Sequence, residues 1–145
     1  MKILSAFALL SAVVFAGETK IALKDLPAPV QKAVAAEQGK GATVRGFTKE
    51  VENGKTEYEA ELSVNGHAKD IAYDAAGTVL SVEEEVAIDA IPAPARAAIE
   101  KAAAGGKVNK VETVTEGGKS FFEASIRKGT KNSEVQVDAS GAKIK

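Results

Sequence analysis

The chain reads Asn53-Gly54-Lys55-Thr56-Glu57-Tyr58-Glu59-Ala60-Glu61-Leu62 and, 64 residues later, Gly117-Gly118-Lys119-Ser120-Phe121-Phe122-Glu123-Ala124-Ser125-Ile126. The match continues downstream, where Asp74-Ala75-Ala76-Gly77 corresponds to Asp138-Ala139-Ser140-Gly141. Upstream, Leu26-Pro27-Ala28-Pro29 corresponds to Ile91-Pro92-Ala93-Pro94 with an offset of 65 residues. Self-similarity over such a long period indicates architecture rather than a local motif. We therefore expect two copies of one small unit.

Each copy predicts one helix followed by four short strands. Prolines 27 and 29 suit a helix start, and glycines 39 and 41 end the helix. Strands are expected at 43–52, 56–64, 67–74 and 78–86, with Asn-Gly dipeptides that favour type I′ hairpins between the first three. In the second copy the fourth strand is reduced to residues 142–145. The predicted fold class is α+β, a tandem repeat of a helix packed on a four-stranded antiparallel sheet.

The predicted repeats cover residues 17–85 and 86–145. A unit of about 60 residues buries only about 60% of its unfolded surface, so it is marginally stable alone. We therefore expect the two copies either to share a sheet or to pack on each other.

The N-terminal segment, residues 1–16, has the pattern of a secretory signal peptide. Lys2 is followed by an apolar run from Ile3 to Phe15, and Val14 and Ala16 occupy the small-residue positions before the cleavage site. The run is too short for a comfortable membrane span, although an uncleaved anchor is the alternative. We predict cleavage after Ala16 and a periplasmic or secreted protein without a membrane segment after cleavage.

The composition excludes several classes of function. The formal net charge is −1, and no cluster of Lys and Arg gives the basic surface of a nucleic-acid-binding protein. The chain has no Cys, which excludes a disulfide framework, a thiolate metal site and a Cys nucleophile.

No sequence motif predicts catalysis. His67 is the only histidine, and a zinc site typically needs four donors. Gly54-Lys55-Thr56 and Gly118-Lys119-Ser120 resemble the end of a phosphate-binding loop, but the earlier glycine is missing and a strand rather than a helix follows. A G-x-S-x-G nucleophile elbow is also absent. We predict that the chain is not an enzyme and has no catalytic residues, cofactor or dedicated metal site.

Alternation along the strands predicts one apolar and one polar face for each sheet. The apolar face, packed under the helices, should carry Tyr58, Ala60, Leu62, Val64, Ile71 and Tyr73 in the first copy and Phe122, Ala124, Ile126, Val135 and Val137 in the second. The opposite face should be open and mostly acidic, as an antiparallel sheet allows.

The candidate binding residues lie on this open face. Glu57, Glu59 and Glu61 alternate on one strand, and Asp70 should lie across from them on the next. Three interpretations remain: a solvated face, an acidic docking surface for a basic partner, or a hard-cation site, which would need oxygens from neighbouring strands as well.

The second copy contributes three more candidate residues to the predicted open face. Phe121 replaces the glutamate that occupies its position in the first copy, and it either covers a junction or edge or serves as a binding anchor. Glu123 and Arg127 would flank it as polar contacts.

Several motifs together resemble the PepSY-like family of exported bacterial proteins. They are L-P-x-x-V at Leu26–Val30, G-K-x-x-Y-E-A at Gly54–Ala60 and F/Y-D-x-x-G-x-V/I at Tyr73–Val79. This family is similar in fold to the β-lactamase inhibitor protein, whose concave sheet grips an enzyme. The resemblance implies an inhibitor-like fold and a possible peptidase partner outside the cytoplasm, with no catalytic motif.

The sequence therefore predicts an exported, non-catalytic protein that binds a protein partner in the cell envelope, such as a peptidase or other hydrolase, through its open sheet face. The expected contacts are Glu57, Glu59, Glu61, Asp70, Phe121, Glu123 and Arg127. The alternative is a low-affinity periplasmic binder of a cation or small ligand that uses the same acidic face.

Overall fold

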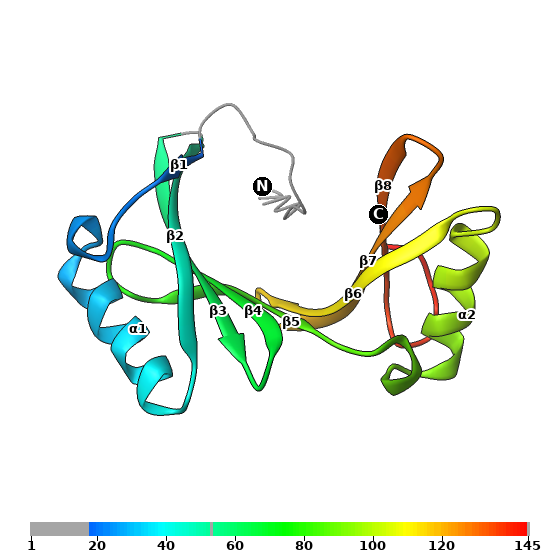
Figure 1. Ribbon diagram of the computed structural model, residues 1–145, viewed down its shortest axis with the longest axis horizontal. Helices are drawn as coiled ribbons and strands as arrows, with labels where there is room; N and C mark the ends of the chain where they lie inside the picture. Colours follow the sequence, from blue (N-terminus) through cyan, green and yellow to red (C-terminus); the bar gives the residue numbers. More distant parts are fainter. Residues whose placement is uncertain (1–17, 53, 145) are drawn as a thin grey trace.

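A computed structural model describes residues 18–52 and 54–144 (Figure 1). The predicted signal peptide, its cleavage site and Asn53 of the first hairpin lie outside the described residues. In the described part, eight strands form one antiparallel sheet in the order in which they occur in the sequence. The strands are β1 (Thr19–Lys20), β2 (Thr43–Glu52), β3 (Lys55–Val64), β4 (His67–Tyr73), β5 (Val79–Glu85), β6 (Lys107–Glu116), β7 (Lys119–Lys128) and β8 (Lys131–Val137). The helices are α1 (Ala28–Gly39) and α2 (Ala93–Ala102), preceded by the 3₁₀ turns η1 (Leu23–Asp25) and η2 (Ile88–Ala90).

The predicted tandem repeat of a helix on a four-stranded sheet is wrong, because the chain forms a single eight-stranded sheet. The error concerns β5, the last strand before α2. β5 pairs with β4 on one side and with β6 on the other, so no sheet ends between them. At the C-terminus, the expected fourth strand at 142–145 is reduced in the described residues to one isolated bridge between Val137 and Lys143.

The strand that precedes each helix pairs with the strand that follows it. β1 pairs with β2 around α1, and β5 pairs with β6 around α2. The pairing is extended at matched positions, where Ile21 N–H donates to the Phe47 carbonyl and Val86 N–H donates to the Val111 carbonyl. We call residues 18–78 the first half and residues 79–144 the second half; each contains a strand, a helix and three further strands in that order.

The tight turns follow the sequence chemistry. Asn65 and Gly66 join β3 to β4 with φ of 52° and 83°, and Gly117 and Gly118 join β6 to β7 with φ of 56° and 76°. Two consecutive positive φ angles are the requirement of a type I′ turn, which confirms the hairpin expected at Asn65-Gly66.

Each helix packs on the sheet through its own apolar core, as the alternation predicted. The first core joins Val30 and Val34 of α1 to strand residues such as Leu62 and Ile71. The second core joins Ala95 and Ile99 of α2 to strand residues that include Ala124, Ile126, Val135 and Val137.

Two glycine turns hold the starts of the helices against the sheet. Gly77 and Gly141 have φ of 79° and 82°, which an L-residue rarely adopts. A Cβ on Gly77 would lie 2.8 Å from the Pro29 carbonyl oxygen, and one on Gly141 would lie 2.5 Å from that of Pro94. Only glycine therefore allows these turns to approach the first turns of α1 and α2.

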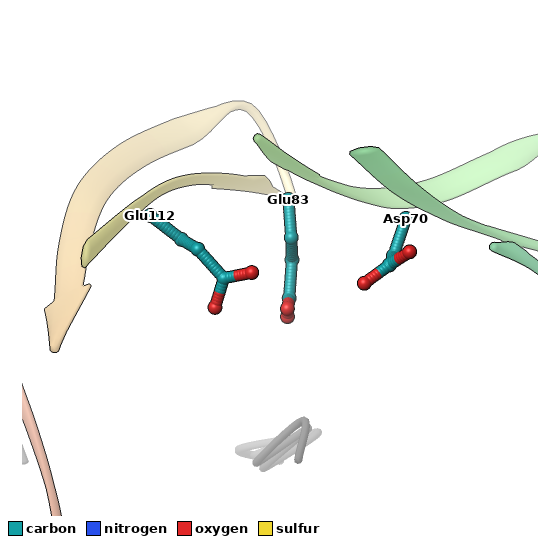
Figure 2. Close-up of side chains that lie close together, drawn as sticks. All are labelled: Asp70, Glu83 and Glu112. Atoms are coloured by element: carbon teal, nitrogen blue, oxygen red, sulfur yellow. The ribbon is translucent and has the colours of Figure 1, made fainter. Parts of the chain in front are cut away.

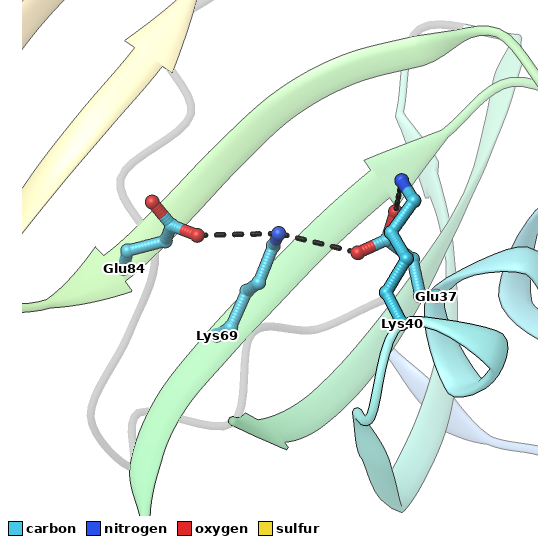
Figure 3. Close-up of polar contacts among 4 residues, drawn as sticks. All are labelled: Glu37, Lys40, Lys69 and Glu84. Carbon is cyan, nitrogen blue, oxygen red and sulfur yellow. Dashed lines mark hydrogen bonds and ion pairs between the residues drawn. The ribbon is translucent and has the colours of Figure 1, made fainter. Parts of the chain in front are cut away.

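An ion-pair network ties the end of α1 to the sheet (Figure 3). Lys69 Nζ of β4 lies 3.2 Å from Glu37 Oε2 of α1 and 3.2 Å from Glu84 Oε1 of β5. Lys40 Nζ pairs with the other oxygen of Glu37 at 2.7 Å. α1 is therefore held to two strands by charge as well as by its apolar face.

The sheet bends strongly, and both helices lie on the outside of the bend, at opposite ends of the molecule (Figure 1). The other surface, which we call the helix-free face, lies on the inside of the bend. No described helix has the length and apolar character needed to cross a membrane.

Candidate functional site

Three carboxylates meet at the centre of the helix-free face (Figure 2). They are Asp70 of β4, Glu83 of β5 and Glu112 of β6, one from each of three adjacent strands. Their neighbours Ile71, Val82 and Val111 face the helix side, and successive residues of a strand point to opposite faces. We call these three residues the carboxylate cluster.

Strand register explains how the cluster assembles. Asp70 lies directly opposite Glu83 in the β4–β5 ladder. Glu112 lies opposite Glu85, so it is a diagonal neighbour of Glu83 across the β5–β6 ladder. One oxygen from each carboxylate lies within 4.8 Å of the others. Figure 2 shows all three side chains extending from the same side of the sheet, with the Glu83 carboxylate between the other two.

The cluster is largely shielded from solvent. Glu83 is 4% exposed and Glu112 is 3% exposed, while Asp70 is half-buried. Burial, followed by the nearby charges of Glu112, Glu123, Glu59 and Asp70, raises the pKa of Glu83 to about 9. Removing a carboxylate from water and placing it among like charges both favour its neutral form.

Asp70 is affected in the same direction but less strongly. Burial raises the pKa of Asp70 to about 6, and Glu112 and Glu61 add to the shift while Lys110 opposes it. Its Oδ1 atom is buried and has no hydrogen-bond partner among the described residues. At neutral pH the cluster therefore combines an ionised Asp70 with a Glu83 that holds its proton.

Lys110 is the cation built into the cluster. Its Nζ lies 2.6 Å from Glu112 Oε1. Burial lowers the pKa of Lys110, but the hydrogen bond and charge of Glu112, with Asp70 and Glu83, outweigh burial and raise it. One ammonium thus faces three carboxylates.

Two further glutamates flank the cluster, the half-buried Glu59 and the buried Glu123. Glu59 on β3 lies opposite Thr48, whose Oγ1 is 3.5 Å from Glu59 Oε2. Glu123 on β7 is 2% exposed and accepts a 2.6 Å hydrogen bond from Gln136 Nε2. Burial raises the pKa of Glu59 to about 8 and that of Glu123 to about 7.

The structure divides the sequence-predicted site residues into two groups. Glu59, Glu61 and Asp70 lie together, since Glu61 is directly opposite Asp70 and the charges of both act on Glu59. Glu57 lies further along β3, opposite Glu50.

The residues predicted in the second copy are spread over β7. Phe121 is half-buried opposite Val114, and Glu123 is buried beside Gln136. Arg127 is exposed near the β7–β8 turn, where its Nε donates to the Gly129 carbonyl at 3.1 Å. The structure does not bring Arg127 into the carboxylate cluster.

Sequence reasoning missed Glu83, Glu112 and Lys110. Glu83 lies within the acidic run of residues 83–85, where alternation with Ser81 and Val82 was the available signal. The β5–β6 pairing that brings Glu83 towards Glu112 joins segments separated by α2, and no local pattern encodes that register.

The arrangement offers oxygen ligands and protonated carboxyl groups. A hard divalent cation prefers several carboxylate oxygens of this kind.

No protein-family model and no curated protein sequence matches the chain. Among solved structures, the fold is similar to that of a protein of Bacteroides eggerthii that is provisionally described as periplasmic, with a TM-score of 0.67 and 16% identity over 83% of this chain and 86% of that one. A DUF2874 family protein of Bacteroides uniformis has a TM-score of 0.64 and 18% identity over 82% and 86% of the two chains.

A BLIP-like protein of Bacteroides fragilis has a TM-score of 0.59 and 20% identity over 81% of this chain and 82% of that one. At such identities the likeness concerns the fold. The chain therefore has the fold of DUF2874 family proteins and of a BLIP-like protein.

Proposed function

We propose that this chain is an exported, non-catalytic binding protein whose helix-free face holds a basic segment of a protein partner in the cell envelope. The observation that carries the proposal is the acidic helix-free face itself. Both helices cover the outside of the bend and leave the inside uncovered (Figure 1). Complementary charge across such a face favours capture of a basic segment and discriminates against acidic ones.

The charges of this face form a buried floor and a more accessible rim. Glu83, Glu112 and Glu123 form the floor, where each is less than 5% exposed. Glu57 and Glu61 are more accessible along β3. A partner would therefore contact the rim and Phe121 first, and the rim carboxylates supply the negative charge that attracts a basic segment.

The likeness to other proteins supports the fold and the location that this proposal needs. This chain shares the fold of a BLIP-like protein, and its single sheet has one face without helices (Figure 1). Its N-terminal segment has the pattern of a signal peptide. A structural neighbour is provisionally described as periplasmic. A peptidase or other hydrolase is the partner class that the resemblance to the inhibitor protein suggests.

Site-specific cross-linking in cell envelopes tests the proposal. A photoreactive phenylalanine analogue is placed at position 121, on the helix-free face, and in a second protein at the exposed position 101 on α2. The expected result is one partner cross-linked from position 121 through a Lys- or Arg-rich peptide, and no such product from position 101.

Charge reversal provides the control. Glu57→Lys with Glu61→Lys should remove the cross-link, because the rim then repels a basic segment. Glu84→Lys reverses a neighbouring charge on the helix side and should leave the cross-link intact. A cross-link that survives the double reversal, or one formed equally from position 101, would show that the helix-free face is not the binding surface.

A further inference from the structure

We propose that Asp70, Glu83 and Glu112 form a binding site for one hard divalent cation of the Ca²⁺ class. This proposal goes beyond the protein-binding role, because the cation would occupy the floor of the helix-free face and needs no partner. The cation interpretation of the sequence used Asp70 with the glutamates of β3, whereas this site joins Asp70 to Glu83 and Glu112.

The geometry of the carboxylate cluster fits a cation in size. One oxygen from each of the three side chains lies within 4.8 Å of the others. Ca²⁺ binds oxygens at about 2.4 Å, so ligands on opposite sides of the ion are about 4.8 Å apart. Mg²⁺ binds at about 2.1 Å in a stricter octahedron and retains its water, which makes it a weaker match to three carboxylates on separate strands.

Glu83 provides an independent indication of a ligand. The residue is 4% exposed as a whole, and within the described residues its side chain makes neither a hydrogen bond nor an ion pair. It points into the space between Asp70 and Glu112 (Figure 2). A buried polar group without a partner is destabilising, so a group held in this way requires a proton, a cation or both.

The orphaned oxygen of Asp70 points to the same conclusion. Asp70 Oδ1 is buried without a hydrogen-bond partner among the described residues. Glu112 Oε1 is likewise buried without a hydrogen bond among the described residues, although Lys110 Nζ lies 2.6 Å from it. A single ammonium cannot neutralise three carboxylates, so a divalent ion would complete the charge balance when all three are ionised.

Protons and the cation should compete for the cluster. Carboxylates bind a cation in their ionised form, so a cation must displace any proton that the cluster holds. Glu59, Asp70, Glu112, Glu123 and Lys110 are the charged groups around Glu83. Acidification should therefore weaken binding of the cation, and binding should release protons into the buffer.

Equilibrium dialysis of the purified full chain with Ca²⁺ tests the site, and calorimetry in buffers of different ionisation enthalpy measures the released protons. The expected result is one Ca²⁺ per chain with a dissociation constant in the range of extracellular calcium modules, about 0.1–1 mM at pH 8. Glu83→Gln and Asp70→Asn should each weaken binding by about tenfold or more, because each removes a charged ligand.

One further variant is a matched control, and another tests the effect of the Lys110 charge. Glu84→Gln makes the same chemical change one residue away but on the helix side, and it should bind Ca²⁺ as the unaltered chain does. Lys110→Met removes the competing ammonium and should strengthen binding several-fold. Circular dichroism confirms that each variant is folded.

The proposal is overturned if the unaltered chain takes up no Ca²⁺ at about 10 mM, well above the expected dissociation constant. It is also overturned if folded Glu83→Gln and Asp70→Asn bind Ca²⁺ as tightly as Glu84→Gln does. Neither result would affect the cross-linking from position 121, so failure of the cation site and failure of partner binding can be distinguished.

Discussion

The two halves of the sheet place a glutamate at the same position, half-buried in the first half and buried in the second, but surround it differently. Thr48 lies opposite Glu59 in the β2–β3 ladder, and Glu112 lies opposite Glu123 in the β6–β7 ladder. These two pairs are related by the 64-residue offset of the sequence. The backbone register is therefore the same in both halves. The residue opposite the glutamate is a threonine, Thr48, in the first half and a second glutamate, Glu112, in the second half.

The strand on the other side of each glutamate also differs. Ala72 lies opposite Glu59 and offers no hydrogen bond, whereas Gln136 lies opposite Glu123 and donates one at 2.6 Å. Burial raises the pKa of both glutamates, but this hydrogen bond restrains the shift of Glu123. The residues on the adjacent strands, rather than the position in the backbone, thus determine which hydrogen bonds each of these two carboxylates makes.

The helix side shows a corresponding difference in packing, and it provides the largest expected effect. α1 buries Val30 and Val34, whereas α2 buries Ala95 and Ile99 at the matched positions. We expect Ile99→Ala to lower the free energy of unfolding by about 2–5 kcal/mol, because it removes the largest side chain that holds α2. Val34→Ala should cost about 1 kcal/mol less, since it removes fewer carbons and leaves Val30 in place.

Guanidinium unfolding followed by circular dichroism measures both variants. Because one sheet runs through both halves, each variant should unfold in a single transition. Two separate transitions, or a larger loss in Val34→Ala than in Ile99→Ala, would contradict this account of the two cores.

The next effect concerns pH and the two flanking glutamates. A raised pKa means that the folded protein binds a proton that the unfolded chain has lost. The contribution to stability is complete below the unfolded pKa of about 4.5 and decreases as pH rises, to about pH 8 for Glu59 and to about pH 7 for Glu123. Each such proton changes the free energy of unfolding by about 1.4 kcal/mol per pH unit within its window.

Glu59→Gln and Glu123→Gln separate the two contributions. We expect the unaltered protein to lose stability between pH 5 and pH 8, and each variant to show a weaker loss. Between pH 7 and pH 8 only Glu59 still loses its proton. In this range the free energy of unfolding should therefore depend less on pH in Glu59→Gln than in Glu123→Gln. Thermal unfolding across this range, with the helix-side variant Glu84→Gln as control, measures the difference; parallel profiles for all three would contradict it.

The sequence predicted local structure well because its signals are local. The Asn65-Gly66 turn, the helix start at Pro27 and the apolar face around Leu62 each depend on neighbouring residues, and the structure has all three. The arrangement around β5 could not be read in the same way. The acidic run at 83–85 looks like a strand in any sheet, and nothing local states that it pairs on both edges.

The candidate site was predicted only in part for the same reason. Asp70 was identified because it lies one hairpin away from Glu61. Glu112 is separated from β5 by α2, so the approach of Glu83 and Glu112 depends on a long-range register. Lys110 corresponds to Gly46 in the 64-residue repeat of the sequence. Glycine has no side chain, so only the second half has an ammonium group at this position.

The smallest expected effect comes from the ion pairs of α1, which have no charged equivalent at the matched positions Ala102 and Ser133. Lys69 is 20% exposed and Glu37 15% exposed, so this pair is only partly screened by solvent. We expect Lys69→Met to lower the free energy of unfolding by about 1 kcal/mol. Arg96→Met breaks a more exposed pair with Asp89 and should cost about 0.5 kcal/mol or less.

The acid response distinguishes this pair from the helix-free face. Hydrogen bonds from Lys40 and Lys69 lower the pKa of Glu37, against the opposing effect of burial. The stability that this shift contributes is present above the unfolded pKa of about 4.5 and is lost as pH falls through the lowered value. The difference between Lys69→Met and the unaltered protein should therefore shrink in urea titrations below about pH 4. A difference that grew on acidification would show that Lys69 acts through its packing rather than through Glu37.

Acid should therefore act in opposite directions on Glu59 and Glu123 of the helix-free face and on Glu37 of α1. Protonation of Glu59 and Glu123 stabilises the fold, because burial has raised their pKa values, whereas protonation of Glu37 breaks its ion pairs and destabilises the fold.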